Sequence, residues 1–362
     1  MNFDFSEEQE LFRSSVERFA GDLDAPKRWA LRKNTGGYDR GRWQIMAELG
    51  LLALAAPARF DGLDGEAIDL AVVGEALGKA IAPDPWLENG VLPVRLLALA
   101  GASKAVNGAM AGTAIYAAAL AERQGRYTLA PHQTKAVASA DGYVLSGEKT
   151  FVLGGALADR LIVSADLAGE VAVFLVDAAQ AGVDARHYRI VDGSLASEIK
   201  FLDVALAKDQ RLALGLADLE ITAADVRLQA AAEMLGLAQR LFDDTLDYVK
   251  QRQQFGVPIG TFQVIQHRLV ECYAKLEQAR SMLYRAALTN RDNVAEWRRA
   301  AAGAKAFVGD VAGHIAREAV QLHGGMGITE ELLIGHAMKR VLLLSSFLGD
   351  SDAALVDYAV AA

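Results

Sequence analysis

Two segments in the C-terminal part of the chain carry residue types that can hold a phosphate group. The first is Arg252-Gln-Gln-Phe255-Gly256, and the second is Gln321-Leu-His-Gly324-Gly325-Met-Gly-Ile-Thr329. A guanidinium can pair with two phosphate oxygens at once, and glycines let backbone amides approach a phosphate closely. Taken alone, each segment also fits a structural role: a surface arginine at a helix end, and a glycine helix C-cap.

Composition excludes several classes of protein. The single cysteine, Cys272, rules out an intrachain disulfide and any metal site built on several cysteines. No apolar run is long enough to span a membrane. The acidic, polar N-terminus is neither a signal nor a transit peptide, so a cytoplasmic protein is expected. The net charge of −9 argues against a nucleic-acid partner, whose phosphates would require a basic face.

Hydrophobic periodicity divides the 362 residues into three blocks. Residues 1–120 predict an N-terminal α-helical domain, which opens with a capping box of Ser6 and Gln9 and includes a helical stretch over 91–122. Residues 121–210 contain short apolar runs between turn signals, typical of a small antiparallel β-domain of barrel or sandwich type. Residues 211–362 predict a C-terminal four-helix bundle. The expected fold class is therefore α+β.

The bundle is predicted from long Ala/Leu-rich stretches without proline. Helices are expected over 218–252, 263–290 and 296–322, with a short closing helix over 350–362. Helices that are apolar on several sides are buried on several sides, which suits a bundle that packs against other subunits. Small residues such as Gly236 and Gly309 would let helices approach closely. The middle block has no G-x-G-x-x-G motif, so a Rossmann dinucleotide site is not supported.

The block order and several motifs resemble the acyl-CoA dehydrogenase family over nearly the whole chain. The most specific match is Tyr248-x-x-x-Arg252-x-x-Phe255-Gly256-x-Pro258-Ile259-x-x-Phe262-Gln263. Trp43-x-x-Met-Ala-Glu-Leu-Gly50 is similar to an early helix of the family, and Gly142-Tyr-Val-Leu-Ser-Gly-Glu-Lys149 is similar to its middle strand pair. The resemblance implies an enzyme that removes the α-proton of an acyl-CoA thioester while FAD accepts the β-hydride.

The resemblance also implies which residues bind the cofactor. Arg252 would reach the FAD pyrophosphate of a neighbouring subunit, and Phe255 would pack on the adenosine side. Gln321, Gly324 and Gly325 would line the adenine and ribityl region across the same interface. Gln263 and Gln266 are weaker candidates for nearby polar contacts. His267, His314 and His336 are expected to be structural or exposed, and Cys272 is expected to be a small core residue.

The catalytic base of the family is missing from both of its usual positions. This chemistry needs a carboxylate within reach of the α-proton, most often a Glu before a Gly in a Glu-Gly-Thr segment. Here the matching segment places Leu348 before Gly349. Some members carry the Glu on the helix before the Arg-x-x-Phe-Gly segment, and that position holds Val226. No residue of this chain is therefore assigned as the base.

Two further segments depart from the family pattern. Asp350 and Asp352 stand where residues that touch FAD are expected, and carboxylates beside a pyrophosphate are unfavourable. The middle-domain loop that ordinarily contacts flavin and substrate reads Ala121-Glu122-Arg-Gln-Gly125-Arg-Tyr-Thr-Leu-Ala-Pro131. Such departures resemble the heteromeric branch that works in bacterial breakdown of sterol and bile-acid side chains, in which a partner subunit carries the base.

Three hypotheses follow from the resemblance. The first is a dehydrogenase subunit in a heterotetramer with a homologous partner, acting on a bulky acyl-CoA, with an electron-transfer flavoprotein as acceptor. The second is a self-sufficient homo-oligomer, such as a homotetramer, with a relocated base for which Asp225, Glu233 and Asp350 are candidates. The third is a non-catalytic structural subunit that kept the fold and lost the cofactor. The first is favoured because the usual base positions are empty.

Overall fold

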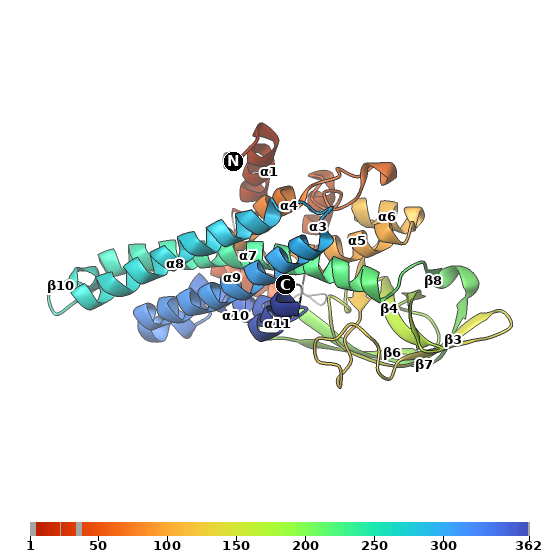
Figure 1. Cartoon of the computed structure of the whole chain (residues 1–362). Coiled ribbons are helices and arrows are strands. Elements are labelled where there is room, and N and C mark those ends of the chain that lie inside the picture. Colours follow the sequence, from red (N-terminus) through yellow and green to blue (C-terminus); the bar gives the residue numbers. More distant parts are fainter. Residues whose placement is uncertain (1–4, 22, 34–37, 361–362) are drawn as a thin grey trace. The chain divides into compact units, whose positions relative to one another are not determined.

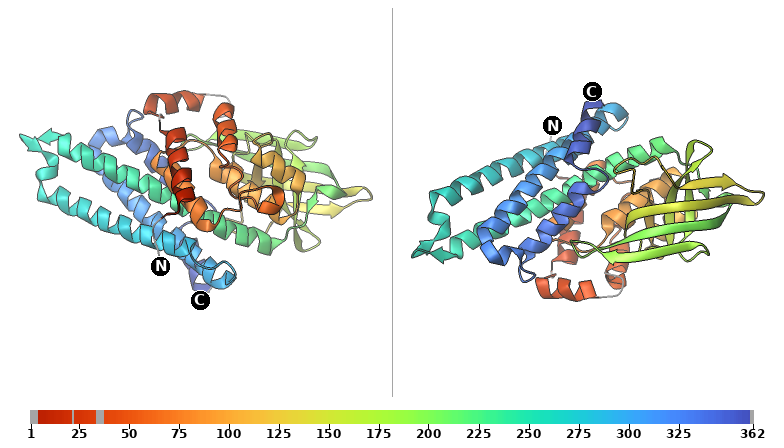
Figure 2. Two further views of the ribbon diagram at one scale, coloured as in Figure 1. Left: turned by 90° about the horizontal axis from the view of Figure 1, so that it is seen from above. Right: turned by 90° about the horizontal axis from the view of Figure 1, so that it is seen from below.

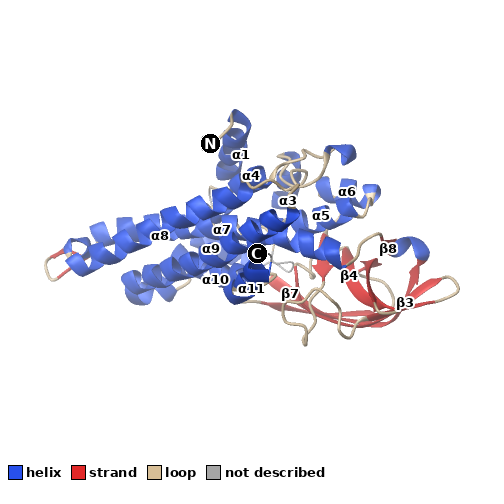
Figure 3. Cartoon of the chain, in the orientation of Figure 1, coloured by secondary structure: helices blue, strands red, loops and turns tan. Residues whose placement is uncertain are grey.

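The computed structural model of the chain describes residues 5–21, 23–33 and 38–360, and these fold into two compact units. A helical unit comprises Met1–Ala30, Glu66–Ala82 and Arg227–Ala362. A β-containing unit comprises Leu31–Gly65 and Pro83–Val226. Figures 1 and 3 show long helices in the first unit and the main sheet in the second. In none of the described ranges does a helix combine the length and apolar character needed to cross a membrane.

The helical unit contains the bundle that the sequence predicts. Its helices are α1 (Glu7–Ala20), α4 (Ala67–Lys79), α7 (Leu216–Gln251, which begins in the other unit), α8 (Gln263–Ala287), α9 (Val294–His323), α10 (Leu333–Ser346) and α11 (Ser351–Val360). Helices α7, α8, α9 and α10 lie side by side (Figures 1 and 2), which confirms the C-terminal four-helix bundle. Helix α10 was not anticipated by the sequence reasoning.

Local sequence signals explain how two of these helices are placed. The predicted capping box at the start of α1 is present: Ser6 Oγ accepts from the amide of Gln9, and Gln9 Oε1 accepts from the amide of Ser6. Gly236 on α7 permits a close approach to α4, because a Cβ there would lie 2.0 Å from the carbonyl oxygen of Glu75. A side chain at this position would force the two helices apart.

The β-containing unit is built around one sheet. Its strands are β1 (Tyr116–Ala119), β2 (Lys135–Ala138), β3 (Gly142–Leu153), β4 (Arg160–Leu167), β5 (Glu170–Asp177), β6 (Val183–Arg189), β7 (Leu195–Ala207) and β8 (Arg211–Leu212). The strand order is β6-β7-β3-β2-β4-β5-β8, and β1 pairs with β4. Buried side chains such as Phe174 and Phe201 fill the core of this domain.

The predicted antiparallel β-domain is largely confirmed, with two differences. Strand β4 pairs in parallel with both β1 and β2. The helical prediction over 91–122 is wrong for its last part, because residues 116–119 form β1. This Ala-rich segment has helical propensity, but its backbone groups are satisfied by the parallel pairing with residues 160–163 of β4. Tertiary pairing has overridden local propensity.

Short helices complete the β-containing unit. They are α3 (Arg40–Glu48), a 3-10 turn (Ala58–Phe60), a π-helical turn (Trp86–Val91), α5 (Leu92–Leu99), α6 (Ser103–Met110) and a 3-10 turn (Lys208–Gln210), while α2 (Ala25–Lys33) crosses the boundary between the units. The π-helical turn is buried and carries Asn89, whose Nδ2 donates to the carbonyl of Tyr116 at 2.8 Å. This bond ties the helices to β1.

Candidate functional site

The first predicted cofactor segment forms a β-hairpin at the end of α7. Strands β9 (Gln253–Gln254) and β10 (Val257–Pro258) pair antiparallel, with Phe255 and Gly256 at the tip. Both tip residues have positive φ, 55° and 81°, as the tightest hairpin turns require. This backbone suits glycine but strains phenylalanine. Phe255 is nonetheless 90% exposed, and the Phe262 ring lies beside it at 6.2 Å between centroids.

The second predicted segment begins at the C-terminal end of α9. Gln321 is exposed in the last turn, and the helix ends at Gly324, which has φ 63° and is followed by a 3-10 turn (Gly324–Ile328). No heavy atom lies within 4 Å of a Cβ placed on Gly324 or Gly325. The backbone is therefore open on this side, as an approaching ligand would need.

One aromatic contact brings the two segments together within the helical unit. The Tyr248 ring, one turn before Arg252, stacks on the His323 ring at 4.2 Å between centroids and 24° between planes. His323 is buried, and its Nδ1 lies 2.8 Å from the carbonyl oxygen of Ala319. The hairpin and the glycine turn consequently occupy the same end of the bundle, which we call the hairpin end.

The hairpin end has the chemistry of an anion site. Arg252, Gln263 and Gln321 are all exposed there. Neither segment, 252–263 or 321–329, contains an aspartate or a glutamate. A guanidinium, two amides and open glycine backbone fit a pyrophosphate, because each offers donors to phosphate oxygens. Gln266 is already engaged, since its Nε2 donates to the carbonyl of Gly260 at 3.0 Å.

The segment expected to carry the base lies in the turn between α10 and α11. Leu348 has φ 56° and Gly349 has φ 131°, so two successive residues have positive φ. Arg227 holds this turn: its Nε donates to the carbonyl of Leu348 at 2.6 Å, and its guanidinium pairs with Asp357 of α11. The turn is well anchored, but Leu348 presents no group that can accept a proton.

The alternative base positions are equally unavailable. Val226 is fully buried. The neighbouring Asp225, also buried, forms an ion pair with Arg95 at 3.1 Å between Nε and Oδ2. Glu233 forms a buried bidentate pair with Arg340, at 2.7 Å and 3.1 Å. Both candidate carboxylates on α7, Asp225 and Glu233, are therefore committed to structural ion pairs.

Asp350 and Asp352 line a groove between α9, α10 and α11. The groove has a volume of about 360 Å³ and is also lined by Asp310, Arg317 and Leu342. Asp350 caps α11, because its Oδ1 accepts from the amide of Ala353 at 2.9 Å. Three carboxylates and one guanidinium give this groove a net negative charge. It is therefore unfavourable for a pyrophosphate, in contrast to the hairpin end.

A buried lysine lies behind the same turn. Lys305 of α9 is 1% exposed, and its Nζ donates to the carbonyl of Leu344 near the end of α10. Burial, and to a lesser extent the charge of Arg227, lower the pKa of Lys305 to about 7, while Asp350 acts in the opposite direction. Two cationic side chains from α7 and α9 thus hold the backbone around Leu348.

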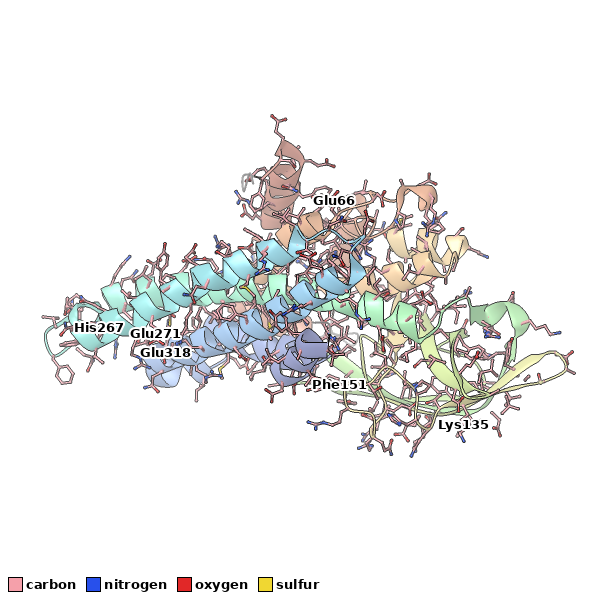
Figure 4. All side chains as sticks on the ribbon, viewed as in Figure 1. Glu66, Lys135, Phe151, His267, Glu271 and Glu318 are labelled. Carbon is pink, nitrogen blue, oxygen red and sulfur yellow. The ribbon has the colours of Figure 1, made fainter. Side chains whose placement is uncertain are left out.

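Sequence reasoning missed an exposed aromatic residue in the β-containing unit. Phe151, labelled in Figure 4, is 40% exposed and has φ 51°. It lies where the register between β3 and β7 shifts, between Lys149 and Val152. Bulges that re-aim side chains are frequent beside active sites, and strained residues cluster there. The available signal was an aromatic residue three positions before Gly154, which follows the strand, but the exposure of Phe151 depends on the irregular strand pairing.

The remaining predicted residues have structural roles or are exposed. Cys272 is buried in α8, and burial raises the pKa of its thiol to about 11. His267 lies on the surface near the hairpin end (Figure 4), and the buried His336 lies with its Nε2 3.2 Å from the carbonyl of Glu330. Across the described ranges, no cluster of three His, Cys, Asp or Glu side chains could hold a metal ion.

Comparison with known proteins identifies the class to which this fold and site belong. The sequence models of the N-terminal, middle and C-terminal domains of acyl-CoA dehydrogenases match residues 6–102, 117–204 and 215–359. Together these matches cover most of the chain. The chain therefore belongs to the acyl-CoA dehydrogenase family, a family of oxidoreductases.

Individual members of the family are similar to this chain over nearly its whole length. The chain is 32% identical to acyl-CoA dehydrogenase IpdE2 of Mycolicibacterium smegmatis, over 95% of each protein. Its fold matches the Tcur3481-Tcur3483 steroid ACAD with a TM-score of 0.88 and 28% identity, covering 98% of this chain and 97% of that one. It also matches PigA with FAD and proline, with a TM-score of 0.90 and 26% identity, over 99% and 98% of the two chains.

Proposed function

We propose that this chain is a subunit of a FAD-dependent acyl-CoA dehydrogenase whose catalytic base comes from a homologous partner subunit. The observation that carries the proposal is that neither the usual base positions nor the candidate carboxylates of α7 offer a free base. Leu348 and Val226 occupy the usual base positions, while Asp225 and Glu233 are held in buried ion pairs. The reaction still needs a base to remove the α-proton, and we infer that another chain supplies it.

We propose that Arg252, Phe255, Gln263, Gln321, Gly324 and Gly325 bind FAD at an interface with that partner. FAD, when bound, accepts the hydride from the β-carbon of the substrate. The guanidinium of Arg252 would hold the pyrophosphate, the exposed Phe255 ring would pack on the adenosine, and the open glycine backbone would admit the dinucleotide. The absence of acidic residues from both segments supports this assignment, as does the FAD bound to the structural relative PigA.

The kind of substrate and the assembly are proposed from the relatives. The Tcur3481-Tcur3483 protein is a steroid ACAD that combines two different chains. We infer a heterotetramer acting on a bulky acyl-CoA, such as one with a steroid ring system, with an electron-transfer flavoprotein as acceptor. Because the groove with Asp350 and Asp352 disfavours a pyrophosphate, each pair of unlike subunits should hold one FAD.

The test is to purify the chain alone and together with a homologous dehydrogenase chain encoded beside it. The complex should be yellow, should contain one FAD per pair of subunits, and should oxidise an acyl-CoA. Activity should vanish when the partner's carboxylate at the position of Leu348 is changed to glutamine. A yellow, fully active enzyme formed by this chain alone would refute the proposal.

One observation keeps a self-sufficient homo-oligomer as the second candidate. Asp350 is partly exposed in the groove of α9, α10 and α11, directly after the turn that holds Leu348. The purified homo-oligomer would then exchange the α-proton of a non-oxidisable acyl-CoA analogue with solvent deuterium, and Asp350→Asn would abolish the exchange. A non-catalytic role would instead leave both the chain and its native complex without a flavin absorbance band.

A further inference from the structure

A cavity in the helical unit contains none of the residues proposed above to bind FAD. It lies between α1, α4, α7 and α8, and its volume is about 310 Å³. Every residue that lines it belongs to this unit, and α1 lies beside α4 there (Figures 1 and 2). Pockets that hold small molecules begin at about 300 Å³. We call this site, which is large enough for a small ligand, the α1 cavity.

One wall of the α1 cavity is a closed network of charged and polar groups. Glu75 Oε1 accepts from Arg280 Nη1, and Glu75 Oε2 accepts from the Tyr284 hydroxyl at 2.7 Å. Arg280 Nη2 donates to Gln239 Oε1 at 2.7 Å. Burial and the negative charge of Glu75 raise the pKa of Tyr284, so its phenol stays protonated at neutral pH. These groups satisfy one another and fix the shape of the wall.

An apolar surface adjoins this wall. The Phe5 and Tyr284 rings meet edge to face, with 5.7 Å between centroids and 82° between planes. Val72 and Ala76, one turn apart on α4, are buried and also line the cavity. Ligand pockets are lined mainly by such apolar and aromatic side chains, with a few polar groups that fix orientation. The α1 cavity therefore offers a surface for the apolar body of a ligand.

Three further charged side chains line the cavity outside the network. Arg13 and Glu17 come from α1, and Lys79 comes from the last turn of α4. Arg13 pairs with Glu10 through Nη2 at 2.7 Å, but its Nε makes no hydrogen bond with the residues that the structure describes. Glu17 and Lys79 are exposed. Together with the ion pair of the wall, the lining carries three cations and two carboxylates, which favours a ligand with one negative charge.

We propose that the α1 cavity binds a small monocarboxylate with an apolar body. The carboxylate would bond Arg13 and Lys79, and the body would pack on Phe5 and Tyr284. A guanidinium suits a carboxylate because it can donate two parallel hydrogen bonds to it. A phosphate is disfavoured because its second negative charge would lie beside Glu17. The inference does not depend on the proposed function, since none of these residues is assigned to FAD or to the acyl-CoA.

Calorimetric titration of the full chain with hydrocinnamate tests the site without flavin, partner or turnover. Hydrocinnamyl alcohol, which has the same body without the charge, should bind about tenfold more weakly. Phenethyl phosphate, which carries more negative charge, should also bind more weakly. Equal Kd values for the acid and the alcohol, or tighter binding of the phosphate, would overturn the proposal. So would the absence of binding by both hydrocinnamate and octanoate at millimolar concentration.

Substitutions establish where the acid binds. Arg13→Gln and Lys79→Gln should each raise the Kd of hydrocinnamate by about tenfold, since each removes a charged hydrogen bond. The controls are Arg18→Gln on α1 and Lys250→Gln on α7, which change exposed residues that do not line the cavity. Both controls should leave the Kd unchanged. If all four substitutions have the same effect, the acid binds elsewhere and the proposal fails.

The apolar contacts have a separate test. Phe5→Ala should raise the Kd by about fivefold, because a ring contact is lost. Leu11→Ala, at an exposed position of α1 outside the cavity, should not change it. A bound acid that joins α1 to α4 should also slow amide hydrogen exchange in α1 of the unaltered chain, and should not do so in Arg13→Gln at the same concentration. Equal protection of α1 in both chains would contradict the proposed site.

Discussion

The hairpin end and the turn between α10 and α11 belong to the same helical unit but are built in opposite ways. At the hairpin end, Arg252 and Phe255 project into solvent, and the glycines after α9 leave the backbone open. At the turn, Arg227 and Lys305 bond the backbone carbonyls of Leu348 and Leu344 from within the protein. The hairpin end exposes its hydrogen-bond donors to solvent, whereas the donors at the turn are bonded to carbonyl groups of the same chain.

This difference separates the binding of a cofactor from the chemistry performed on a substrate. A region with unused donors and strained, exposed side chains is prepared for a ligand that it does not yet hold. A region whose charges are satisfied within the chain contributes rigidity. In most members of the acyl-CoA dehydrogenase family the two roles are combined in one subunit. Under the function proposed above, this chain keeps the first role and a partner subunit supplies the second.

The largest effect is expected from Glu233→Gln, which tests whether the carboxylates near the turn are structural. The change leaves Arg340 buried without its bidentate partner, so the free energy of unfolding should fall by about 4 kcal/mol. Urea denaturation measures this. Glu277→Gln, which removes an exposed carboxylate that pairs with Arg280 at 3.6 Å, should cost well under 1 kcal/mol. Loss of activity without loss of stability would instead make Glu233 a catalytic group.

Lys305→Met should raise the free energy of unfolding by about 3 kcal/mol at pH 7, because it removes a charge that burial disfavours. The pKa of Lys305 is lowered to about 7 in the folded protein. The unfolded chain consequently binds more protons between pH 7 and about 10. Stability should rise with pH across that window and stay level below it.

Denaturation from pH 6 to 9.5 checks this prediction. The rise should disappear in Lys305→Met and persist in Lys250→Met, whose lysine is exposed. An unchanged pH dependence in Lys305→Met would mean that the lysine remains charged throughout the range.

Arg252→Ala probes the hairpin end. Removal of the guanidinium should weaken FAD binding to the assembled complex by about thirtyfold, or about 2 kcal/mol, with little effect on unfolding. The flavin absorbance retained after dialysis measures the loss. Arg285→Ala, at an exposed position in the last turn of α8, is the control. Equal retention of flavin by both variants would remove the hairpin from the cofactor site.

The smallest effect is expected from Leu348→Gly. Glycine relieves the strain of a positive φ, which costs about 1 kcal/mol in leucine. Leu348→Ala keeps that strain, so the difference between the two variants in urea denaturation isolates it. A glycine variant no more stable than the alanine variant would show that the turn tolerates leucine without strain.

Much of the fold could be predicted from the sequence, because its signals are local. Helical periodicity predicted a helix over 218–252, which the structure has as Leu216–Gln251, and the Ser6 capping box is present as predicted. The hairpin at Phe255 was not foreseen, since the surrounding sequence is strongly helical. Residues 116–119 were assigned to a helix because strand pairing with β4 leaves no local trace in an Ala-rich segment.

The candidate site could be predicted only in part, because the contacts that assemble it join residues far apart in the sequence. Family motifs point to Arg252 and Gln321, but the Tyr248–His323 stacking that unites their segments joins distant parts of the chain. The pairing of Glu233 with Arg340, and of Asp225 with Arg95, also depends on contacts far apart in sequence. Without those contacts, both carboxylates remained candidate bases. The exposure of Phe151 likewise depends on a register shift between two strands.

The single cysteine offers a way to measure how often the helical bundle opens locally. Cys272 lies buried on α8, and burial raises the pKa of its thiol to about 11. Since only an exposed thiolate reacts readily, alkylation must wait until α8 lifts from its neighbours. The labelling rate therefore counts spontaneous openings of the bundle. Binding of a partner subunit to the hairpin end would lower the rate of Cys272 alkylation. Association of the subunits could then be followed without an activity assay.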